Sequence, residues 1–536
     1  MKATVRRLLL WGVLLWMIQP NLFAQTKVSF VFTESDTRRI TPVMIAVTDT
    51  NGVAYLPPDG RVAPAPSYPD IAFKGVQYNP APGWVGPVRR MMGRGSVNGQ
   101  RTYVYDSNPT LPYWRDTVMY QVNGRCTISL LPGVYFIQVQ HGNEYVPIRL
   151  RFTVSGKRVT HRIALRRWID LPARGWYSGD VHAHHRWDGA GFRSYMMNLT
   201  RAEDVHVLNV LEMGDRQKTA FTPPGFGNAF RLCKEKYCIV PGQEEPRSTY
   251  GHLIGLNTTA LTRDTTHYDY YDLVFDAIHK NPASLVGFAH FAYGGEGVHE
   301  GMALYGSSGV DFVELLQNTQ LGTADYYNYL NLGFKIAAAA GSDFPWGSTV
   351  GDGRTFVYTG NNFSADAWFQ GLKAGRTFVS NGPALFIDVN GQLPGANIEA
   401  GHQMDVVVRA KAISDPAIGK IKRLEIHHSE GLLATIPNDP GSDSLELNLV
   451  AVIKKSDWLV AVVYCDNGAV AHTSPVYCTV AGKPVFNENT GPAMVTRLRS
   501  LLLHIRGDEE KKTNPDKGLL DRVVNALRFY EALHDK

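Results

Sequence analysis

The spacing of apolar positions predicts β-strands in the first part of the chain. From about residue 26 onward, short runs of Val, Ile, Phe and Tyr, such as Lys27–Thr33 and Cys126–Leu131, alternate with Gly, Pro, Asn and Asp. Runs of this length bounded by turn residues are typical of strands. We therefore predict a small β-sandwich-like domain over residues 25–170, interrupted by a long aromatic loop region between about residues 57 and 115.

Between residues 171 and 382 the pattern changes to apolar strand-like runs separated by helical stretches. The strand candidates begin near Trp176 and continue with Val205–Leu211, Cys238–Pro241, His252–Leu256, Ser284–Phe291, Asp311–Leu316 and Ile336–Gly341. The helical candidates are Gly191–Ala202, Tyr268–Lys280, Ala324–Leu332 and Ala365–Ala374. Such alternation predicts an α/β domain with a parallel sheet or barrel, whose chemistry lies at the carboxyl ends of the strands.

The remaining chain returns to β character and then becomes helical. Runs such as Asp405–Ala412 and Trp458–Cys465 predict a second small β-sandwich over residues 383–485. Residues 486–536 are expected to be helical. One apolar stripe at helical spacing, expected to pack on the rest of the protein, contains Leu519, Leu520, Val523, Leu527 and Tyr530.

Composition narrows the class of protein. The 536 residues are too many for one ordinary domain, and 44% hydrophobic with 19% charged residues is typical of a globular chain. The formal charge of +5 is mild, and no block of Lys and Arg stands out. We therefore expect no nucleic-acid partner.

The first residues have the features of a signal peptide. Arg6 and Arg7 precede the apolar run Leu8–Ile18, and Ala24 is a small residue suited to cleavage, so residues 1–24 are expected to be removed. The alternative is a membrane anchor, but the run is short for a span of about 20 residues. We expect a periplasmic or secreted protein with no membrane span after signal removal.

Export permits disulfides among the five cysteines. Cys465 and Cys478 lie in successive β-like runs and are one candidate pair. Cys233 and Cys238 flank a short polar segment. The fifth, Cys126, leaves an odd count, and we interpret all five as structural.

The stretch Gly179–His185 is the strongest signal of chemistry. His182 and His184 are one residue apart on a predicted extended chain, so their imidazoles point to the same side. Imidazoles so placed can bind one metal ion. Alone, the pair would more often be a histidine-rich surface turn.

Further acids and histidines recur at the ends of the predicted strands. They are Glu244, Glu245, His252, His290, Glu314 and Asp343. Imidazole and carboxylate together suit Zn, Mn or Fe. The combination predicts a site for one or two divalent metal ions.

The motifs G-D-V-H-A-H, P-G-Q-E, G-F-A-H, V-E-L-L-Q-N and A-G-S-D, read in chain order, resemble the PHP (polymerase and histidinol phosphatase) superfamily of metallohydrolases. More narrowly, they are similar to exported members of the carbaryl-hydrolase-like branch, to which the stretch Ala471–Tyr477 is also similar. The likeness covers residues 171–382 well and the following β-domain moderately. It implies a distorted (β/α)7 barrel, here flanked by the two β-sandwich domains and the C-terminal helical segment.

The resemblance also implies a ligand set. His182, His184, Glu244 and Asp343 would hold one ion, and Glu244 would bridge to a second ion held with His290. His252 matches the Gly-His that follows the glutamate in this branch and is assigned to the second ion. Glu314 matches the family's strand-end acid, and its role, for which support of a ligand from outside is one candidate, stays open.

Two departures from the family pattern affect the number of ions. Leu211-Glu212-Met213 stands where the family has T-D-H, and Gly341–Pro345 lacks the histidine of G-S-D-x-H. Those histidines belong to a third metal in the family. One or two ions are therefore expected, and the roles of Glu212 and Glu245 stay open.

The expected activity is hydrolysis of a small-molecule ester by metal-activated water. Attack at phosphorus (a phosphoester) and at carbon (a carbamate or carboxylic ester) both stay open. His185 and Asp188 are candidates for proton transfer, or for support of the first ligands, and Arg247 for contact with an anionic substrate group, or for pairing with a local carboxylate. The alternative is a non-catalytic periplasmic or cell-surface protein with a degenerate barrel and glycan-binding β-domains; the oligomeric state is not predicted.

Overall fold

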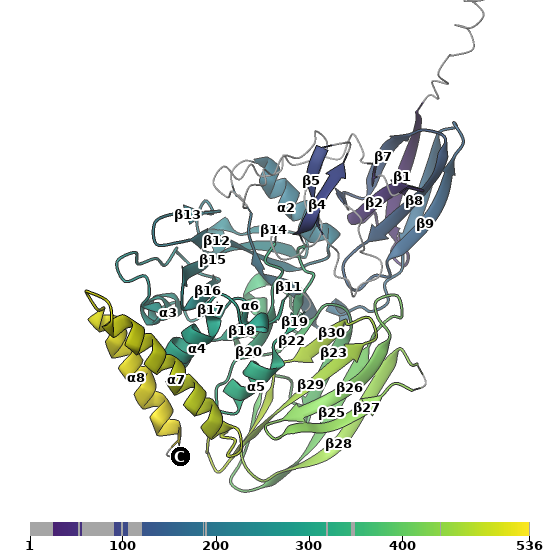
Figure 1. The fold of residues 1–536 in the computed structure, drawn as a ribbon. Coiled ribbons are helices and arrows are strands. Elements are labelled where there is room, and N and C mark those ends of the chain that lie inside the picture. The colour runs from purple at the N-terminus through teal and green to yellow at the C-terminus, as the bar shows by residue number, and fades with distance from the viewer. Residues whose placement is uncertain are drawn as a thin grey trace, which may run out of the picture.

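The structure is a computed structural model. It describes residues 25–534 except 52–53, 56–90, 98–99, 106–119, 186, 188–189, 318–319, 345–348 and 440. The expected signal peptide, most of the aromatic loop region and Asp188 therefore lie outside the described residues. Figure 1 shows the fold, with the central strands between an N-terminal β region and a C-terminal β region.

Two sheets form the N-terminal region. One has the order β10-β1-β7, and the other has the order β3-β2-β8-β9 with β6 paired to β2. Their strands are β1 (Thr26–Glu34), β2 (Val43–Asp49), β3 (Ala54–Tyr55), β6 (Tyr120–Val122), β7 (Arg125–Leu130), β8 (Gly133–Gln140), β9 (Ile148–Val154) and β10 (Val159–Leu165). A separate hairpin joins β4 (Met91–Val97) and β5 (Gln100–Tyr105). Buried Phe30 and Ile45, one from each main sheet, belong to the same core, so the region is sandwich-like.

The central region carries the strands that position the candidate site. They are β11 (Trp176–Ala183), β12 (Val207–Gly214), β13 (Thr219–Ala220), β14 (Leu232–Lys234), β15 (Tyr237–Ser248), β16 (Gly251–Leu256), β17 (Leu285–Phe288), β18 (Phe312–Gln317), β19 (Gln320–Leu321), β20 (Ala337–Ala340), β21 (Arg354–Tyr358) and β22 (Thr377–Ser380). The helices between them are α2 (Ala190–Ala202), α3 (Tyr271–His279), α4 (Val298–Tyr305), α5 (Thr323–Leu330) and α6 (Ala365–Lys373). The four helices expected from the sequence are confirmed within a few residues, whereas α4 was not expected.

The predicted fold class, an α/β protein built on a distorted (β/α)7 barrel, is wrong. Of the described residues, 42% lie in strands and 22% in helices, and the strands form several sheets. Parallel pairs such as β11–β12 and β18–β20 alternate with antiparallel pairs such as β15–β16 and β16–β17. The connection from β15 to β16 is only Thr249-Tyr250, and a parallel neighbour needs a crossover of a dozen or more residues. An antiparallel hairpin is therefore forced there.

The C-terminal β region continues the central sheet. Strand β22 pairs with β30, so the two regions share one 18-stranded sheet, and β23, β25 and β28 form a second sheet. The strands are β23 (Ala384–Val389), β24 (Asn397–Ala400), β25 (Met404–Ile413), β26 (Ile421–His428), β27 (Gly431–Pro437), β28 (Ser444–Ile453), β29 (Asp457–Cys465), β30 (Val470–Thr473) and β31 (Val476–Val480).

Two long helices end the chain, α7 (Gly491–Glu510) and α8 (Lys517–His534). Leu519, Val523 and Tyr530 of the predicted apolar stripe are buried in a core that also contains Met302 of α4, which confirms the expected packing. Figure 1 shows both helices side by side. Within the described residues, no helix is both long and apolar enough to span a membrane.

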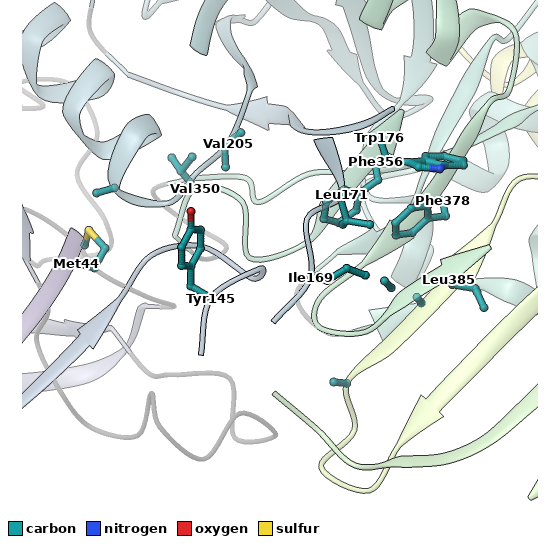
Figure 2. Packing of buried hydrophobic residues seen from close by; sticks show 14 of the residues in the cluster. Met44, Tyr145, Ile169, Leu171, Trp176, Val205, Val350, Phe356, Phe378 and Leu385 are labelled. Atoms are coloured by element: carbon teal, nitrogen blue, oxygen red, sulfur yellow. The ribbon is translucent and has the colours of Figure 1, made fainter. Parts of the chain in front are cut away.

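A continuous hydrophobic core connects the three regions. Figure 2 shows part of it, from the N-terminal sheets through the segment that enters β11 to the C-terminal β region; the labelled residues are Met44, Tyr145, Ile169, Leu171, Trp176, Val205, Val350, Phe356, Phe378 and Leu385. Trp176 packs its ring against Phe378 at a centroid distance of 5.1 Å. The start of the first strand of the site is therefore anchored in this core.

One disulfide joins Cys233 to Cys238, which lie opposite each other in the β14–β15 hairpin. The candidate pair Cys465–Cys478 is wrong, because β29 and β31 pair in a register that places Cys478 opposite Asp457. Cys465 lies at the other end of β29.

Candidate metal centre

The first half of the site is built on the end of β11. His182 and His184 are fully buried, and their Nε2 atoms lie 2.9 Å apart. The peptide His184 N–H donates to Phe344 O, and the Asp343 N–H donates to His182 O, so the segment after β20 is held against the strand. We call His182, His184, Glu244 and Asp343 the first half-site.

In both histidines the Nε2 atoms face each other, and the other ring nitrogen, Nδ1, which we call the outer nitrogen, already has a hydrogen-bond acceptor. His184 Nδ1 lies 3.2 Å from the Leu211 carbonyl oxygen, and His182 Nδ1 lies 2.9 Å from Glu314 Oε1. A carbonyl and a carboxylate accept, so each Nδ1 carries the hydrogen when the ring is neutral. Both Nε2 atoms then present lone pairs toward the same point, as two ligands of one ion do.

Glu244, on β15, lies between these histidines and a second pair. Its Oε2 is 3.3 Å from His184 Nε2, and its Oε1 is 2.9 Å from His252 Nδ1 and 3.5 Å from His290 Nε2. The side chain is almost completely buried. We call Glu244, His252 and His290 the second half-site; Glu244 belongs to both.

The second half-site also brings two imidazole nitrogens and a carboxylate oxygen together. His290 Nε2 lies 3.1 Å from His252 Nδ1, while His290 Nδ1 is 3.1 Å from Gln317 Oε1. His252 Nδ1 lies between Glu244 Oε1 at 2.9 Å and Arg247 Nε at 3.4 Å. Three potential ligand atoms therefore converge, one from each member of the half-site.

Asp343 and Glu314 complete the surroundings. Asp343 Oδ1 lies 3.5 Å from His182 Nε2 and 3.7 Å from His184 Nε2. Glu314 receives the His182 ring on one oxygen and the His290 peptide N–H at 2.8 Å on the other, so it ties the two half-sites together. A side chain at Gly341 would place its Cβ 2.2 Å from Glu314 Oε1 and 2.5 Å from His182 Cβ, which explains the glycine before Asp343.

Two site residues have left-handed backbone conformations. His290 has φ 60° and Asp343 has φ 49°. Residues other than glycine adopt this region at a cost and keep it where the surroundings impose it, often at functional sites. The strain at both positions supports a functional interpretation of the cluster.

The histidines and carboxylates of the cluster shift one another's pKa values. Burial alone would lower the pKa of His182, but the carboxylates of Glu314, Glu244 and Asp343 hold it well above its usual value. Burial would raise the pKa of Glu244, yet Arg247 and the histidines hold it well below its usual value. The carboxylates therefore favour positive charge at this point, which is the electrostatic requirement of a cation site.

The chemistry of these donors fits divalent ions. Inward-facing imidazole nitrogens and carboxylate oxygens, with outer partners that fix the ring tautomers, are the ligands that Zn, Mn and Fe take. Three groups have ligand atoms within 4.8 Å of one another: His182 with His184 and Glu244, His182 with His290 and Glu314, and Glu244 with His252 and His290. The buried residues can thus bind metal; the kind and number of ions stay predictions.

Glu212 and Glu245 form a separate buried acid pair. Glu245 is held by Arg263 at 2.7 Å. Burial, with the charge of Glu245 and a hydrogen bond to it, raises the pKa of Glu212 to about 9. Glu212 therefore holds a proton more readily than an exposed glutamate, beside a Glu245 that is paired with the Arg263 guanidinium.

The three residues predicted to act on substrate lie in different surroundings. Arg247 is a quarter exposed and donates from Nε to Glu244 Oε2 at 3.1 Å. His185 is buried and stacks near the rings of Tyr195 and Phe344, with centroid distances of 5.5 and 6.3 Å. Asp188 lies outside the described residues, and the catalytic roles of all three stay predictions.

The sequence reasoning missed two residues at the second half-site. Gln317 ends β18, three residues beyond Glu314, and Tyr293 follows His290 by three residues. The Tyr293 hydroxyl lies 2.7 Å from His290 Nδ1. A Gly-rich loop directly after a strand-end histidine, Phe291–Gly297, was the available signal for Tyr293.

Comparisons with known proteins do not assign a family. No family model matches the chain, and no curated protein matches it. Among solved structures, PsfC from Pseudomonas syringae PB-5123 is 18% identical over 38% of this chain and 89% of its own, with a TM-score of 0.27. The lesion-specific endonuclease PfuEndoQ from Pyrococcus furiosus is 11% identical over 37% of this chain and 56% of its own, with a TM-score of 0.26.

A third similar structure concerns a β-domain. The fibronectin(III)-like modules of Clostridium thermocellum CbhA are 14% identical over 18% of this chain and 93% of theirs, with a TM-score of 0.12. Similarities this low carry no argument about function. The resemblance to PHP metallohydrolases therefore rests on the motif residues and on the cluster they form.

Proposed function

We propose that this protein is a metal-dependent hydrolase of small esters. The position of Glu244 carries the proposal. Its two oxygens lie within 3.3 Å of His184 Nε2 and 2.9 Å of His252 Nδ1, so one buried carboxylate faces a histidine pair on each side. A shared carboxylate between two sets of histidines is what a pair of hydrolytic ions uses as a bridge.

The residues divide the work of the reaction. Ions bound here would activate water and withdraw charge from an ester oxygen. Glu314 and the Leu211 carbonyl hold the first two imidazoles in the orientation that binding requires. Arg247 uses Nε for Glu244 and His252, and within the described part of the chain its two terminal nitrogens have no partner. We propose that they bind a substrate oxygen that carries negative charge.

The site favours an ester as substrate, with attack by water at either phosphorus or carbon. A phosphoester and a carbamate or carboxylic ester both present an oxygen that gains charge during attack by water. We propose a small molecule as substrate. Action outside the cytoplasm is part of the proposal, supported by the apolar run near the N-terminus and by the Cys233–Cys238 disulfide.

The proposal is tested with a substrate panel. The full chain would be assayed on bis(4-nitrophenyl) phosphate, 4-nitrophenyl phosphate, 4-nitrophenyl acetate and an aryl N-methylcarbamate, each with Zn or Mn. We expect turnover of at least one class, abolished in the His182→Ala, His184→Ala double variant. Absence of turnover with every substrate and both metals would contradict the proposal.

A further inference from the structure

The loop after β17 covers the outer side of the second half-site. It contains the short 3-10 helix η3 (Phe291–Tyr293) and continues to Gly297. Tyr293 contacts the outer nitrogen of His290 at 2.7 Å, and Glu296 Oε2 lies 3.7 Å from His252 Nε2. Tyr293 is half-exposed, with an exposed fraction of 41%, and the Glu296 side chain is exposed, with 60%.

The glycines of this loop are sterically required. A Cβ at Gly295 would lie 2.7 Å from the Tyr293 ring, and one at Gly297, where φ is +80°, would lie 2.1 Å from the Thr249 carbonyl oxygen. A Cβ at Gly294 would lie 2.3 Å from His299 Nε2. Glycine permits these close approaches, and a larger residue at any of the three positions would shift the loop.

The hydrogen bonds around His290 leave the Tyr293 proton available. When His290 Nε2 binds an ion, Nδ1 carries the hydrogen, which lies between Gln317 Oε1 at 3.1 Å and the Tyr293 hydroxyl oxygen at 2.7 Å. In that state the hydroxyl accepts from His290. Among the described residues it has no further hydrogen-bond partner, and a phenol in this position can still donate one hydrogen bond.

We propose that the Tyr293 hydroxyl donates a hydrogen bond to the substrate, at the ester oxygen that gains negative charge during hydrolysis. This inference rests on the proposed function and adds a catalytic residue to it. Removal of one such donor from an oxyanion site typically costs about 10² to 10³-fold in kcat.

The test compares three variants of the full chain loaded with Zn or Mn. Tyr293→Phe keeps the ring and removes the donor; we expect kcat to fall about 10²-fold with KM within a few fold and with unchanged metal content. Gly295→Ala displaces the ring through the 2.7 Å contact and is expected to lower kcat less. Tyr464→Phe, on β29 beneath Arg423, is the matched control and is expected to keep wild-type kcat.

Two results would overturn the inference. Wild-type kcat in Tyr293→Phe would show that the hydroxyl does not act on substrate. The other result is that Tyr293→Phe loses metal and activity, and that excess metal restores both. This would show that the hydroxyl only positions His290.

A binding measurement separates this inference from the proposed function. If wild-type protein hydrolyses none of the esters, calorimetry with inorganic phosphate on the metal-loaded protein tests the donor alone. We expect Tyr293→Phe to bind phosphate about tenfold more weakly, the loss expected for one hydrogen bond to a charged group. Equal affinity, or no binding by either protein, would overturn the inference.

Discussion

The two half-sites use the same donor types in different surroundings. His182 and His184 are fully buried at the end of β11, which has neighbours on both sides, β12 and β21. His252 and His290 lie where β16 begins and β17 ends, beside the half-exposed Tyr293 and the exposed Glu296. The histidines of the first half-site are therefore more deeply buried than those of the second, and we propose that substrate enters beside the second.

The outer partners show the same difference. In the first half-site they are a buried carboxylate, Glu314, and a strand carbonyl, Leu211 O. In the second they are the Gln317 side chain and two residues of a surface loop. Rigid outer partners hold a ligand ring more firmly, so we expect tighter binding at the first half-site.

The largest effect is expected from the shared ligand. Glu244→Gln should abolish binding at both half-sites and reduce hydrolysis by about 10³-fold, which corresponds to about 4 kcal/mol of lost transition-state stabilisation. Elemental analysis and the ester panel measure both. Retention of either ion at wild-type affinity would show that Glu244 is not a ligand shared by the two half-sites.

The adjacent glutamate offers a matched control. Glu245 is equally buried, but its carboxylate binds Arg263 instead of the histidines. Glu245→Gln is expected to bind wild-type amounts of metal, although its thermal stability should decrease because Arg263 loses a charged partner.

Removing the metal and adding it back stepwise tests the order in which the two half-sites bind ions. An ion that binds only the folded state stabilises it by about 2.7 kcal/mol at a free concentration of 100 times Kd. We expect the first equivalent to protect amides of β11 from hydrogen exchange, and the second to protect residues 290–297. Protection of the loop by the first equivalent would reverse the assigned order.

A smaller effect is expected from the outer partners. Glu314→Gln should weaken metal binding about 10 to 100-fold, the usual range for such a partner. Gln317→Ala should weaken it less, because Tyr293 also contacts His290 Nδ1. Competition titrations with a chelator measure both affinities, and an equal loss in the two variants would argue against the proposed asymmetry.

The sequence predicted individual elements better than their assembly. Apolar runs and helical spacing located β11, β12 and four of the helices between β11 and β22 within a few residues. They did not give strand direction: the runs Cys238–Pro241 and His252–Leu256 were expected in a parallel sheet or barrel, whereas β15 and β16 form an antiparallel hairpin. The short helix α4, bounded by Gly297 and Gly306, is buried over most of its surface, so its sequence lacks the apolar and polar faces that make helical periodicity visible.

The site shows a similar limit. Histidines and acids at strand ends were the signal, and the structure brings His182, His184, Glu244, His252 and His290 within reach of one another. Gln317 and Tyr293 carried no such signal, because a neutral side chain becomes a partner only through tertiary placement. The Cys465–Cys478 pairing failed for the same reason, since register along neighbouring strands is set by the whole sheet.

The most direct measurement of the central claim is the number of ions bound by three forms of the full chain. Elemental analysis after incubation with Zn or Mn would compare wild type with the His182→Ala, His184→Ala and the His252→Ala, His290→Ala double variants. We predict about two ions in wild type, about one in the second variant, and loss of the tight ion in the first, in accord with a two-ion clamp. No metal in wild type, or wild-type counts in both variants, would contradict the claim that two unequal half-sites share Glu244.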